Sequence, residues 1–370
     1  MRVGVPREVK NHEYRVGLTP ELVAELVTRG HVVLVQATAG LGAGFSDQAY
    51  AAVGARIVPQ AENVFREVDL IVKVKEPQSF ECAWLGEGQT LFTYLHLAAD
   101  PQLTEALQRS KATCIAYETV TDGQGGLPLL RPMSEVAGRM SIQVGAYFLQ
   151  APNGGRGVLL GGCPGVEKAR VVILGAGVAG QHAAQMAVGM RAKVTLLDIS
   201  PSRLAQVDRD FSGAVETRYA SRSAIAQEVA VADLVIGAAL VPGAPAPKLV
   251  TRSMLASMKP GAVLVDIAID QGGCFETSRP TSHAAPSFEL GGIVHYCVTN
   301  MPGAVPRSST LALNSAISHH LFALADKGTE AALKDDSHLR AGLNIDRGTI
   351  TYPQVALAFG AGAQERRAHA

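Results

Sequence analysis

Short apolar runs alternate with amphipathic patterns along most of the 370-residue chain. In the first third, these runs have the length and the β-branched, apolar composition of buried strands. They lie at residues 2–5, 31–35, 56–58, 69–74, 90–95 and 113–117. Apolar residues between the runs recur at helical spacing, as in residues 20–30, where Thr19 is the expected N-cap and Pro20 the first helical residue. The alternation predicts a parallel sheet with flanking helices.

The same alternation returns after a glycine- and proline-rich segment at residues 152–168. A helix is predicted before this segment, at residues 134–148, and an apolar helix at residues 311–325 is expected to return to the first domain. Further strands are expected at residues 171–173, 194–197, 215–219, 233–238, 263–267 and 295–300. We therefore predict an α/β fold of two domains, each a mostly parallel sheet with flanking helices, and a cleft between them. Residues 1–133 and 305–370 would form a discontinuous substrate domain, and residues 134–304 a Rossmann domain that includes the connecting helix.

The centre of the second domain carries a dinucleotide-binding fingerprint. A β-branched run at residues 171–173 leads into Gly175-x-Gly177-x-x-Gly180, a helical stretch follows, and a second apolar strand ends at Asp198, 23 positions after Gly175. The three glycines allow a tight turn, close approach of a pyrophosphate and close packing of helix on strand. Asp198 is placed to accept hydrogen bonds from ribose hydroxyls, which favours NAD over NADP, because a carboxylate repels a 2′-phosphate. Asp198 could also be a solvated residue at a strand end, and Arg203 could pair with a 2′-phosphate, stack beside the adenine or simply face water.

The composition excludes several classes of partner. Hydrophobic residues make up 47% of the chain and the formal net charge is zero, so no electrostatic attraction to nucleic acid or to an anionic membrane is expected. No signal-peptide pattern opens the sequence and no apolar stretch has the length of a membrane span, which favours the cytoplasm. The five cysteines show no metal-ligand spacing and are read as reduced, mostly buried residues.

Four polar residues fall at or after the ends of predicted strands, where ligands bind in open parallel sheets. They are Arg15, Lys75, His96 and Asp270. Each has a structural alternative: Lys75 could be a surface lysine, His96 a packed histidine, and Asp270 a residue that holds the loop before Gly272.

Together the four residues fit the oxidation of an amino acid. A planar, bidentate contact from Arg15, shared with Lys75, would hold the substrate carboxylate. His96 would carry protons for the amine and the attacking water, and Asp270 would position the water or stabilise a cationic imine.

Longer motifs strengthen this interpretation. Residues 3–20, 72–77, 94–96, 133–140, 175–180 and 298–310 resemble the alanine dehydrogenase and transhydrogenase α-subunit family, and within it the alanine dehydrogenases. The resemblance covers essentially the whole chain. It implies reversible oxidative deamination of L-alanine to pyruvate and ammonium with NAD, in a homohexamer, with Arg15 and Lys75 binding substrate and His96 and Asp270 acting in proton transfer.

The resemblance also implies a set of cofactor-binding residues. These are Ser134, Gly175, Gly177, Val178, Ala179, Gly180, Asp198, Arg203, Ala220, Ala239, Leu240, Ile267, Ala268, Ile269, Asp270, Arg279, Val298, Thr299, Asn300 and Met301. Family members often carry serine where this chain has Ala220. Some members hold magnesium with a glutamate and a histidine, whereas this chain has Ala323 and Lys327 at those positions, so no metal is predicted.

Three other functions stay open at this point. The chain could be the NAD-binding α component of a proton-translocating transhydrogenase, a non-catalytic NAD sensor, or a saccharopine- or lysine-type dehydrogenase. Lys75 and His96 argue against a sensor, which needs no acid–base groups. A long second substrate in the pocket would distinguish the saccharopine type.

Overall fold

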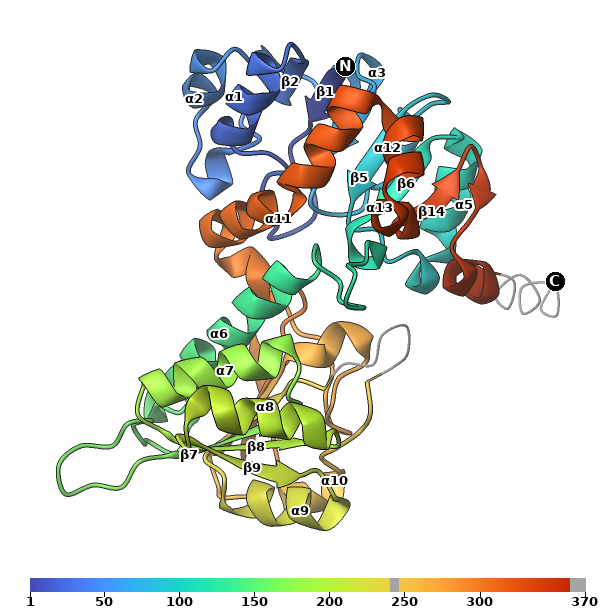
Figure 1. Ribbon diagram of the computed structural model, residues 1–370. Coiled ribbons are helices and arrows are strands. Elements are labelled where there is room, and N and C mark those ends of the chain that lie inside the picture. Colours follow the sequence, from blue (N-terminus) through green and yellow to red (C-terminus); the bar gives the residue numbers. More distant parts are fainter. Residues whose placement is uncertain (240–245, 360–370) are drawn as a thin grey trace, which may run out of the picture. The chain divides into compact units, whose positions relative to one another are not determined.

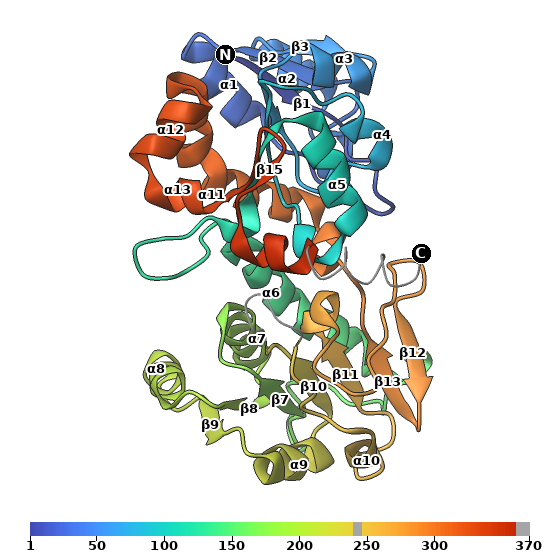
Figure 2. The ribbon, with the colours of Figure 1, turned by 90° about the vertical axis from the view of Figure 1, so that its right-hand side faces the viewer.

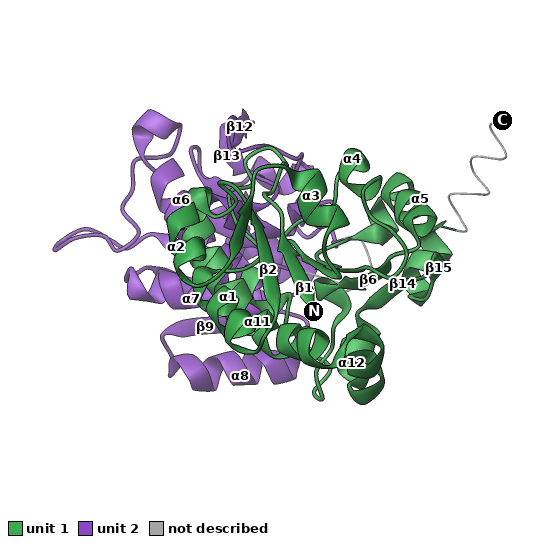
Figure 3. Cartoon of the chain, turned by 90° about the horizontal axis from the view of Figure 1, so that it is seen from above, with its two compact units in different colours: residues 1–133, 305–370 green, residues 134–304 purple. Residues whose placement is uncertain are grey.

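The computed structural model describes residues 1–239 and 246–359. The chain forms two compact units, residues 1–133 with the chain from residue 305 onward, and residues 134–304 (Figure 3). Each unit is a mostly parallel sheet with helices on its faces, as the alternating pattern predicts. Among the described helices, none combines the length and apolar character needed to cross a membrane.

The first unit contains an eight-stranded sheet with the order β15-β14-β6-β5-β4-β1-β2-β3. Its strands are β1 (Arg2–Val5), β2 (Val32–Gln36), β3 (Arg56–Val58), β4 (Leu70–Val72), β5 (Thr90–Thr93), β6 (Thr113–Ala116), β14 (Leu343–Asp346) and β15 (Thr349–Ile350). Its helices are α1 (Pro20–Thr28), α2 (Asp47–Ala52), α3 (Ala61–Arg66), α4 (Ser79–Cys82), α5 (Pro101–Ser110), α11 (Pro306–Lys327), α12 (Thr329–Asp335) and α13 (Ser337–Ala341). Strands β1 to β6 pair in parallel, and β14 pairs antiparallel with both β6 and β15.

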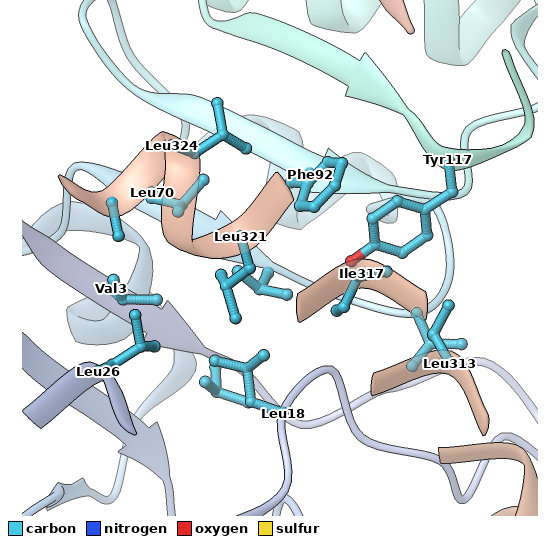
Figure 4. Packing of buried hydrophobic residues seen from close by; sticks show 14 of the residues in the cluster. Val3, Leu18, Leu26, Leu70, Phe92, Tyr117, Leu313, Ile317, Leu321 and Leu324 are labelled. Atoms are coloured by element: carbon cyan, nitrogen blue, oxygen red, sulfur yellow. The ribbon is translucent and has the colours of Figure 1, made fainter. Parts of the chain in front are cut away.

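Helix α11 belongs to the core of this first unit. Leu313, Ile317, Leu321 and Leu324 recur at helical spacing along it, and all four are fully buried. They pack with side chains of β1, β4 and β5, such as Val3, Leu70 and Phe92 (Figure 4). The opposite face of the sheet is covered by α3, α4 and α5. The return of the chain after residue 305 is thus explained by burial of the apolar stripe of α11.

The second unit contains a seven-stranded sheet with the order β12-β13-β11-β10-β7-β8-β9. Its strands are β7 (Arg170–Leu174), β8 (Lys193–Asp198), β9 (Val215–Tyr219), β10 (Leu234–Gly237), β11 (Val263–Asp266), β12 (Ser287–Leu290) and β13 (Ile293–Tyr296). Its helices are α6 (Arg131–Phe148), which begins in the first unit, α7 (Val178–Gly189), α8 (Pro201–Phe211), α9 (Arg222–Val231) and α10 (Arg252–Leu255).

The helices of this second unit lie on both sides of its sheet (Figures 1 and 2). Helices α9 and α10 cover one face through Ile225, Val229 and Leu255. Helix α6 lies against β10, because a Cβ on Gly145 would stand 2.5 Å from Leu234. The order reverses direction at β7, so the point where the fingerprint turn leaves the sheet is a topological switch point.

Two hairpins correct the strands predicted from the sequence. The strand expected at residues 295–300 is β13, which ends at Tyr296, and β12 pairs antiparallel beside it. Gly291 and Gly292 join them with positive φ at both positions, the backbone of a type I′ turn. Strands β14 and β15, which the apolar pattern does not predict, are joined by Arg347 and Gly348, also both at positive φ. An arginine in such a turn gives no sequence signal, because positive φ is uncommon for it.

Candidate active site

The three fingerprint glycines differ in what surrounds them. Gly175 has φ +113°, and a Cβ there would lie 2.7 Å from the carbonyl oxygen of Ala238. At Gly180 a Cβ would lie 1.8 Å from the carbonyl oxygen of Gly175, so only glycine lets α7 start this close to the turn. A Cβ on Gly177 would meet nothing within 4 Å. Gly175 and Gly180 therefore serve the turn itself, whereas Gly177 borders open space at the N-terminus of α7, where backbone N–H groups can bind an anion.

Asp198, the last residue of β8, is held against this turn. Its side chain is 7% exposed; Oδ2 accepts from the backbone N–H of Ala176 at 2.6 Å, and Oδ1 accepts from that of Ser200 at 2.8 Å. A carboxylate offers about four lone-pair sites, so acceptor positions remain for hydroxyl groups. Arg203 lies exposed in the first turn of α8, where its backbone N–H faces Ser200 Oγ at 3.4 Å. Asp198 is thus a structural anchor as well as a candidate ligand.

Most of the remaining cofactor candidates come shortly after strands of the second sheet, and residues at the ends of these neighbouring strands pair with one another. Leu174 pairs with Leu197 and with Gly237, and Gly237 pairs with Asp266. The residues after these positions therefore emerge at one edge of the second unit. They are Val178, Ala179, Ala220, Ala239, Ile267, Ala268, Ile269, Asp270, Val298, Thr299, Asn300 and Met301. Leu240 lies outside the described residues.

Two candidates stand elsewhere in the unit. Ser134 is in the first turns of α6, and this helix comes close to α7, because a Cβ on Gly138 would lie 2.2 Å from the carbonyl oxygen of Ala179. Arg279 is exposed and its guanidinium lies over the ring of Phe288, 4.2 Å from the centroid.

Asp270 and Asp266 have different roles in the segment after β11. Asp266 is fully buried and accepts from the backbone N–H groups of Ala268 and Cys274, and from the hydroxyl of Ser278. Asp266, not Asp270, therefore holds the glycine-containing loop. Asp270 lies in the 3₁₀ helix Ile267–Gln271; it is exposed, and no hydrogen bond or ion pair involves its carboxylate within residues 1–239 and 246–359. This leaves Asp270 able to act on a bound molecule.

In the first unit, Arg15 is almost completely buried, with 2% exposure. Glu13 binds one edge of the guanidinium in a bidentate fashion: Nε donates to Oε1 at 2.7 Å and Nη2 donates to Oε2 at 2.5 Å. On the other side, Nη1 lies 3.0 Å from Sδ of Met133. The carboxylate of Glu13 therefore occupies the edge of the guanidinium that is formed by Nε and Nη2. A substrate carboxylate would have to bind Arg15 on the Nη1 side.

Lys75 is placed by a buried carboxylate. Oε1 of Glu8 accepts from the backbone N–H of Val74 at 2.6 Å and from that of Lys75 at 3.3 Å. Oε2 of Glu8 is 3.2 Å from Nζ of Lys73, which also lies 3.0 Å from Oε1 of Glu81. Burial raises the pKa of the Glu8 carboxyl, although the ammonium of Lys73 opposes this. Burial alone would lower the pKa of Lys73, but the charges of Glu8 and Glu81 more than reverse this effect.

His96 follows β5 in a left-handed backbone conformation, with φ 51°. Its backbone N–H donates to Oε1 of Glu118 at 2.6 Å, and its Nδ1 lies 3.8 Å from the same carboxylate. The imidazole stacks on the ring of Tyr94 with 6.0 Å between centroids, and half of the side chain is exposed. Burial raises the pKa of the Tyr94 phenol, and the guanidinium of Arg15 opposes this effect. Arg15, Tyr94 and His96 all belong to the first unit, while Asp270 belongs to the second unit.

Sequence reasoning missed the acidic residues that hold this site. Glu8, Glu13, Glu81 and Glu118 are all buried or nearly so, and each accepts hydrogen bonds that fix a candidate residue or Lys73. One signal was available: Lys73 interrupts the apolar run at residues 69–74, and a charge inside a buried strand requires a partner.

Comparison with known proteins agrees with this architecture. A family model described as alanine dehydrogenase/PNT, N-terminal domain, matches residues 4–137, and one described as alanine dehydrogenase/PNT, C-terminal domain, matches residues 141–353. The chain belongs to the alanine dehydrogenase/PNT family. It is 58% identical to an alanine dehydrogenase of Halomonas elongata over 97% of both chains.

Two solved structures show the same fold within this family. An L-alanine dehydrogenase superposes with a TM-score of 0.94 at 50% identity, covering 98% of this chain and 99% of the other. A transhydrogenase from Sinorhizobium meliloti superposes with a TM-score of 0.82 at 27% identity, covering 95% of this chain and 99% of the other. The alanine dehydrogenase branch is therefore the nearer of these two.

The residues of this family member fit NAD but not a magnesium ion at positions 323 and 327. Open space at Gly177, the uncapped first turn of α7 and the anchored carboxylate of Asp198 suit a pyrophosphate and a ribose. At the expected magnesium positions, Ala323 has no donor atom and Lys327 forms an ion pair with Asp335 at 2.7 Å. A cation cannot be held by that pair.

The cysteines have the character expected of packed thiols. Cys82, Cys114, Cys274 and Cys297 are buried, and Cys163 is exposed. Burial raises the pKa of Cys82, Cys274 and Cys297 to about 12, so these thiols stay protonated near neutral pH.

Proposed function

We propose that the protein catalyses the reversible, NAD-dependent oxidative deamination of L-alanine to pyruvate and ammonium. The observation that carries this proposal is the 58% identity along 97% of both chains with a relative named alanine dehydrogenase. In the deaminating direction, alanine, water and NAD⁺ give pyruvate, ammonium, NADH and one proton.

The second unit would bind the cofactor at the carboxyl edge of its sheet. The pyrophosphate would meet the N-terminal N–H groups of α7 beside Gly177, and Asp198 would accept from the adenosine ribose. When bound, NAD⁺ accepts the hydride that leaves the α-carbon of the amino acid. Side chains of the protein would bind the substrate and transfer the protons.

Lys75 and Arg15 would hold the substrate carboxylate. The support for Lys75 is its placement after β4 by Glu8, which fixes the backbone from which the ammonium extends. Arg15 would contribute through Nη1, because Glu13 already occupies the edge formed by Nε and Nη2. In the aminating direction, Lys75 would also polarise the carbonyl of pyruvate.

His96 would move protons between the substrate and solvent. Glu118 fixes its backbone through a hydrogen bond from the N–H, and the imidazole, which stacks on Tyr94, is half exposed and so has access to water. It would take the proton from the amine as the imine forms, and then assist the attack of water and the departure of ammonia. Asp270, exposed after β11, would orient that water or stabilise the cationic imine.

The homohexamer and the cytoplasmic location belong to the same proposal. Both rest on the likeness of this chain to the alanine dehydrogenases along nearly all of its length.

The decisive experiment follows NADH absorbance with purified protein. We expect NADH oxidation that requires both pyruvate and ammonium, and little oxidation with 2-oxoglutarate plus lysine. If NADH binds but no combination supports turnover, the proposed reaction is wrong. The 27% identity to a transhydrogenase then directs the test to hydride exchange with a second nucleotide.

Lys75→Ala tests the assignment of the substrate clamp. Loss of a charge-assisted hydrogen bond should raise the KM for pyruvate by at least about tenfold and leave the Kd of NADH unchanged. Lys168→Ala, a change of the same type at an exposed position, is the control. Unchanged KM and kcat in Lys75→Ala would exclude a role for this ammonium in binding substrate.

A further inference from the structure

Outside the candidate active site, two adjacent histidines and an aspartate come together in the first unit. His319 and His320 lie in the second half of α11, and Asp336 joins α12 to α13. One ligand atom from each residue lies within 4.8 Å of the other two. The three helices are neighbours in the structure and are drawn in orange and red (Figure 2).

The pair formed by His320 and Asp336 has the spacing of two ligands of one metal ion. Nδ1 of His320 is 3.4 Å from Oδ2 of Asp336, and this nitrogen makes no hydrogen bond within the described residues although it is buried. Two donor atoms at about 2.1 Å from a tetrahedral ion are separated by about 3.4 Å. The nitrogen and the oxygen therefore face each other as donors to a common centre would, and not as partners in a hydrogen bond.

His319 supplies the third donor. Its ring centroid is 5.4 Å from that of His320, with 69° between the ring planes. Two imidazoles bound to one ion through bonds of about 2.1 Å place their centroids about 5 Å apart. His319 is exposed, so its side chain can rotate to close the remaining gap.

Asp336 is held in position by the start of α13. Oδ1 accepts from the backbone N–H groups of His338 at 2.8 Å and of Leu339 at 3.1 Å. This N-cap fixes the carboxylate and directs Oδ2 toward His320. His338 itself binds Thr121 through Nδ1 at 3.0 Å.

The groups also have the protonation states that a metal requires. Burial lowers the pKa of His320, which favours the neutral imidazole. Burial alone would raise the pKa of Asp336, but the hydrogen bonds from the backbone N–H groups of Leu339 and His338 lower it. Neutral imidazole and ionised carboxylate are the binding forms.

We propose that His319, His320 and Asp336 form a binding site for a divalent transition-metal ion of the zinc type. Two imidazoles and one carboxylate suit Zn²⁺, and water would fill the fourth position. The ion would tie the C-terminal half of α11 to the junction of α12 and α13. The site is distinct from positions 323 and 327, and it does not depend on the proposed reaction.

The test is a calorimetric titration of the untagged, chelator-treated full chain with Zn²⁺. We expect one saturable site per chain and a rise in melting temperature when Zn²⁺ is added. His319→Ala and Asp336→Asn should each weaken binding at least tenfold. His319 is exposed, and asparagine preserves the N-cap, so neither change should unfold the protein.

His31→Gln is the matched control. His31 pairs with Asp326 at 2.8 Å, but within the described chain no third histidine, cysteine, aspartate or glutamate completes a ligand group with this pair. Binding of Zn²⁺ should be the same in this variant as in the parent. The proposal is overturned if the parent shows no saturable site, or if His319→Ala and Asp336→Asn bind Zn²⁺ as tightly as the parent does.

Discussion

The buried ammonium of Lys73 offers the sharpest test of how the first unit is held together. It is fully buried, with Glu8 at 3.2 Å and Glu81 at 3.0 Å. Lys73→Met keeps most of the side-chain volume but leaves two carboxylates without their shared cation. Breaking a buried ion pair by removing one partner costs about 3–5 kcal/mol, which lowers the melting temperature of a unit of this size by roughly 6–20 °C.

The loss should also depend on pH. Burial already raises the pKa of Glu8 in the parent, and removal of Lys73 takes away the charge that opposes this effect. A carboxyl group whose pKa is higher in the folded than in the unfolded state stabilises the fold below its unfolded pKa, and this contribution is lost as the pH rises. The difference in melting temperature between parent and Lys73→Met should therefore be larger at pH 8 than at pH 5.

Thermal unfolding at one protein concentration, followed by circular dichroism, measures both effects. Lys327→Met removes an exposed ammonium paired with Asp335 at 2.7 Å, and we expect almost no change in this control. Adding Glu81→Gln to Lys73→Met should restore part of the stability, because one unpaired charge disappears while the amide oxygen of the new side chain still accepts from the backbone N–H of Gln78. A Lys73→Met protein that melts within about 2 °C of the parent would refute the argument.

Three further predictions concern the site. His96→Asn should lower kcat by about a hundredfold to ten-thousandfold and leave the Kd of NADH unchanged. If the variant has the kcat of the parent, His96 does not act in proton transfer. Gly180→Ala should prevent correct folding of the turn, because its Cβ would lie 1.8 Å from the carbonyl oxygen of Gly175, whereas Gly177→Ala should melt like the parent but bind NADH more weakly. Equal melting temperatures for these two variants would contradict the different roles of the glycines. Asp198→Asn should weaken the binding of NADH more than that of NADPH in a fluorescence titration. An unchanged ratio of the two Kd values would show that this carboxylate does not bind the ribose hydroxyls.

Local patterns are enough to predict several strands of both sheets and the nucleotide turn. Strands β1, β3 and β9 have the bounds expected from their apolar runs, and Gly175 and Gly180 occupy positions in the nucleotide turn that only glycine can take. The hydrophobic period, the residue composition of a segment and the conformational freedom of glycine depend only on residues that are close in the sequence, so they can be predicted from it directly. The hairpin at Gly291 and Gly292 carries the same class of signal, although the apolar pattern alone does not predict it.

The carboxylates that hold the candidate residues in place could not be predicted in this way. Glu8 lies 67 positions from Lys75, and Glu118 lies 22 positions from His96, yet each is within hydrogen-bond distance of its partner's backbone. The bidentate pairing of Arg15 with Glu13 is local, but nothing in the sequence shows that it is buried. Likewise, His320 and Asp336 have no ligand spacing and meet only because α11 and α12 pack together.

The sequence by itself determined the α/β class, the glycine turn and the residue types available for chemistry, because each depends on a few adjacent positions. Only the tertiary structure decided which carboxylates neutralise Lys73, which edge of Arg15 is bound by Glu13 and which histidines face Asp336. These pairings depend on burial and on contacts between distant segments. A buried charge is stable only when it is paired, and its partner can come from a segment that is far away in the sequence, so only the tertiary structure shows the pair.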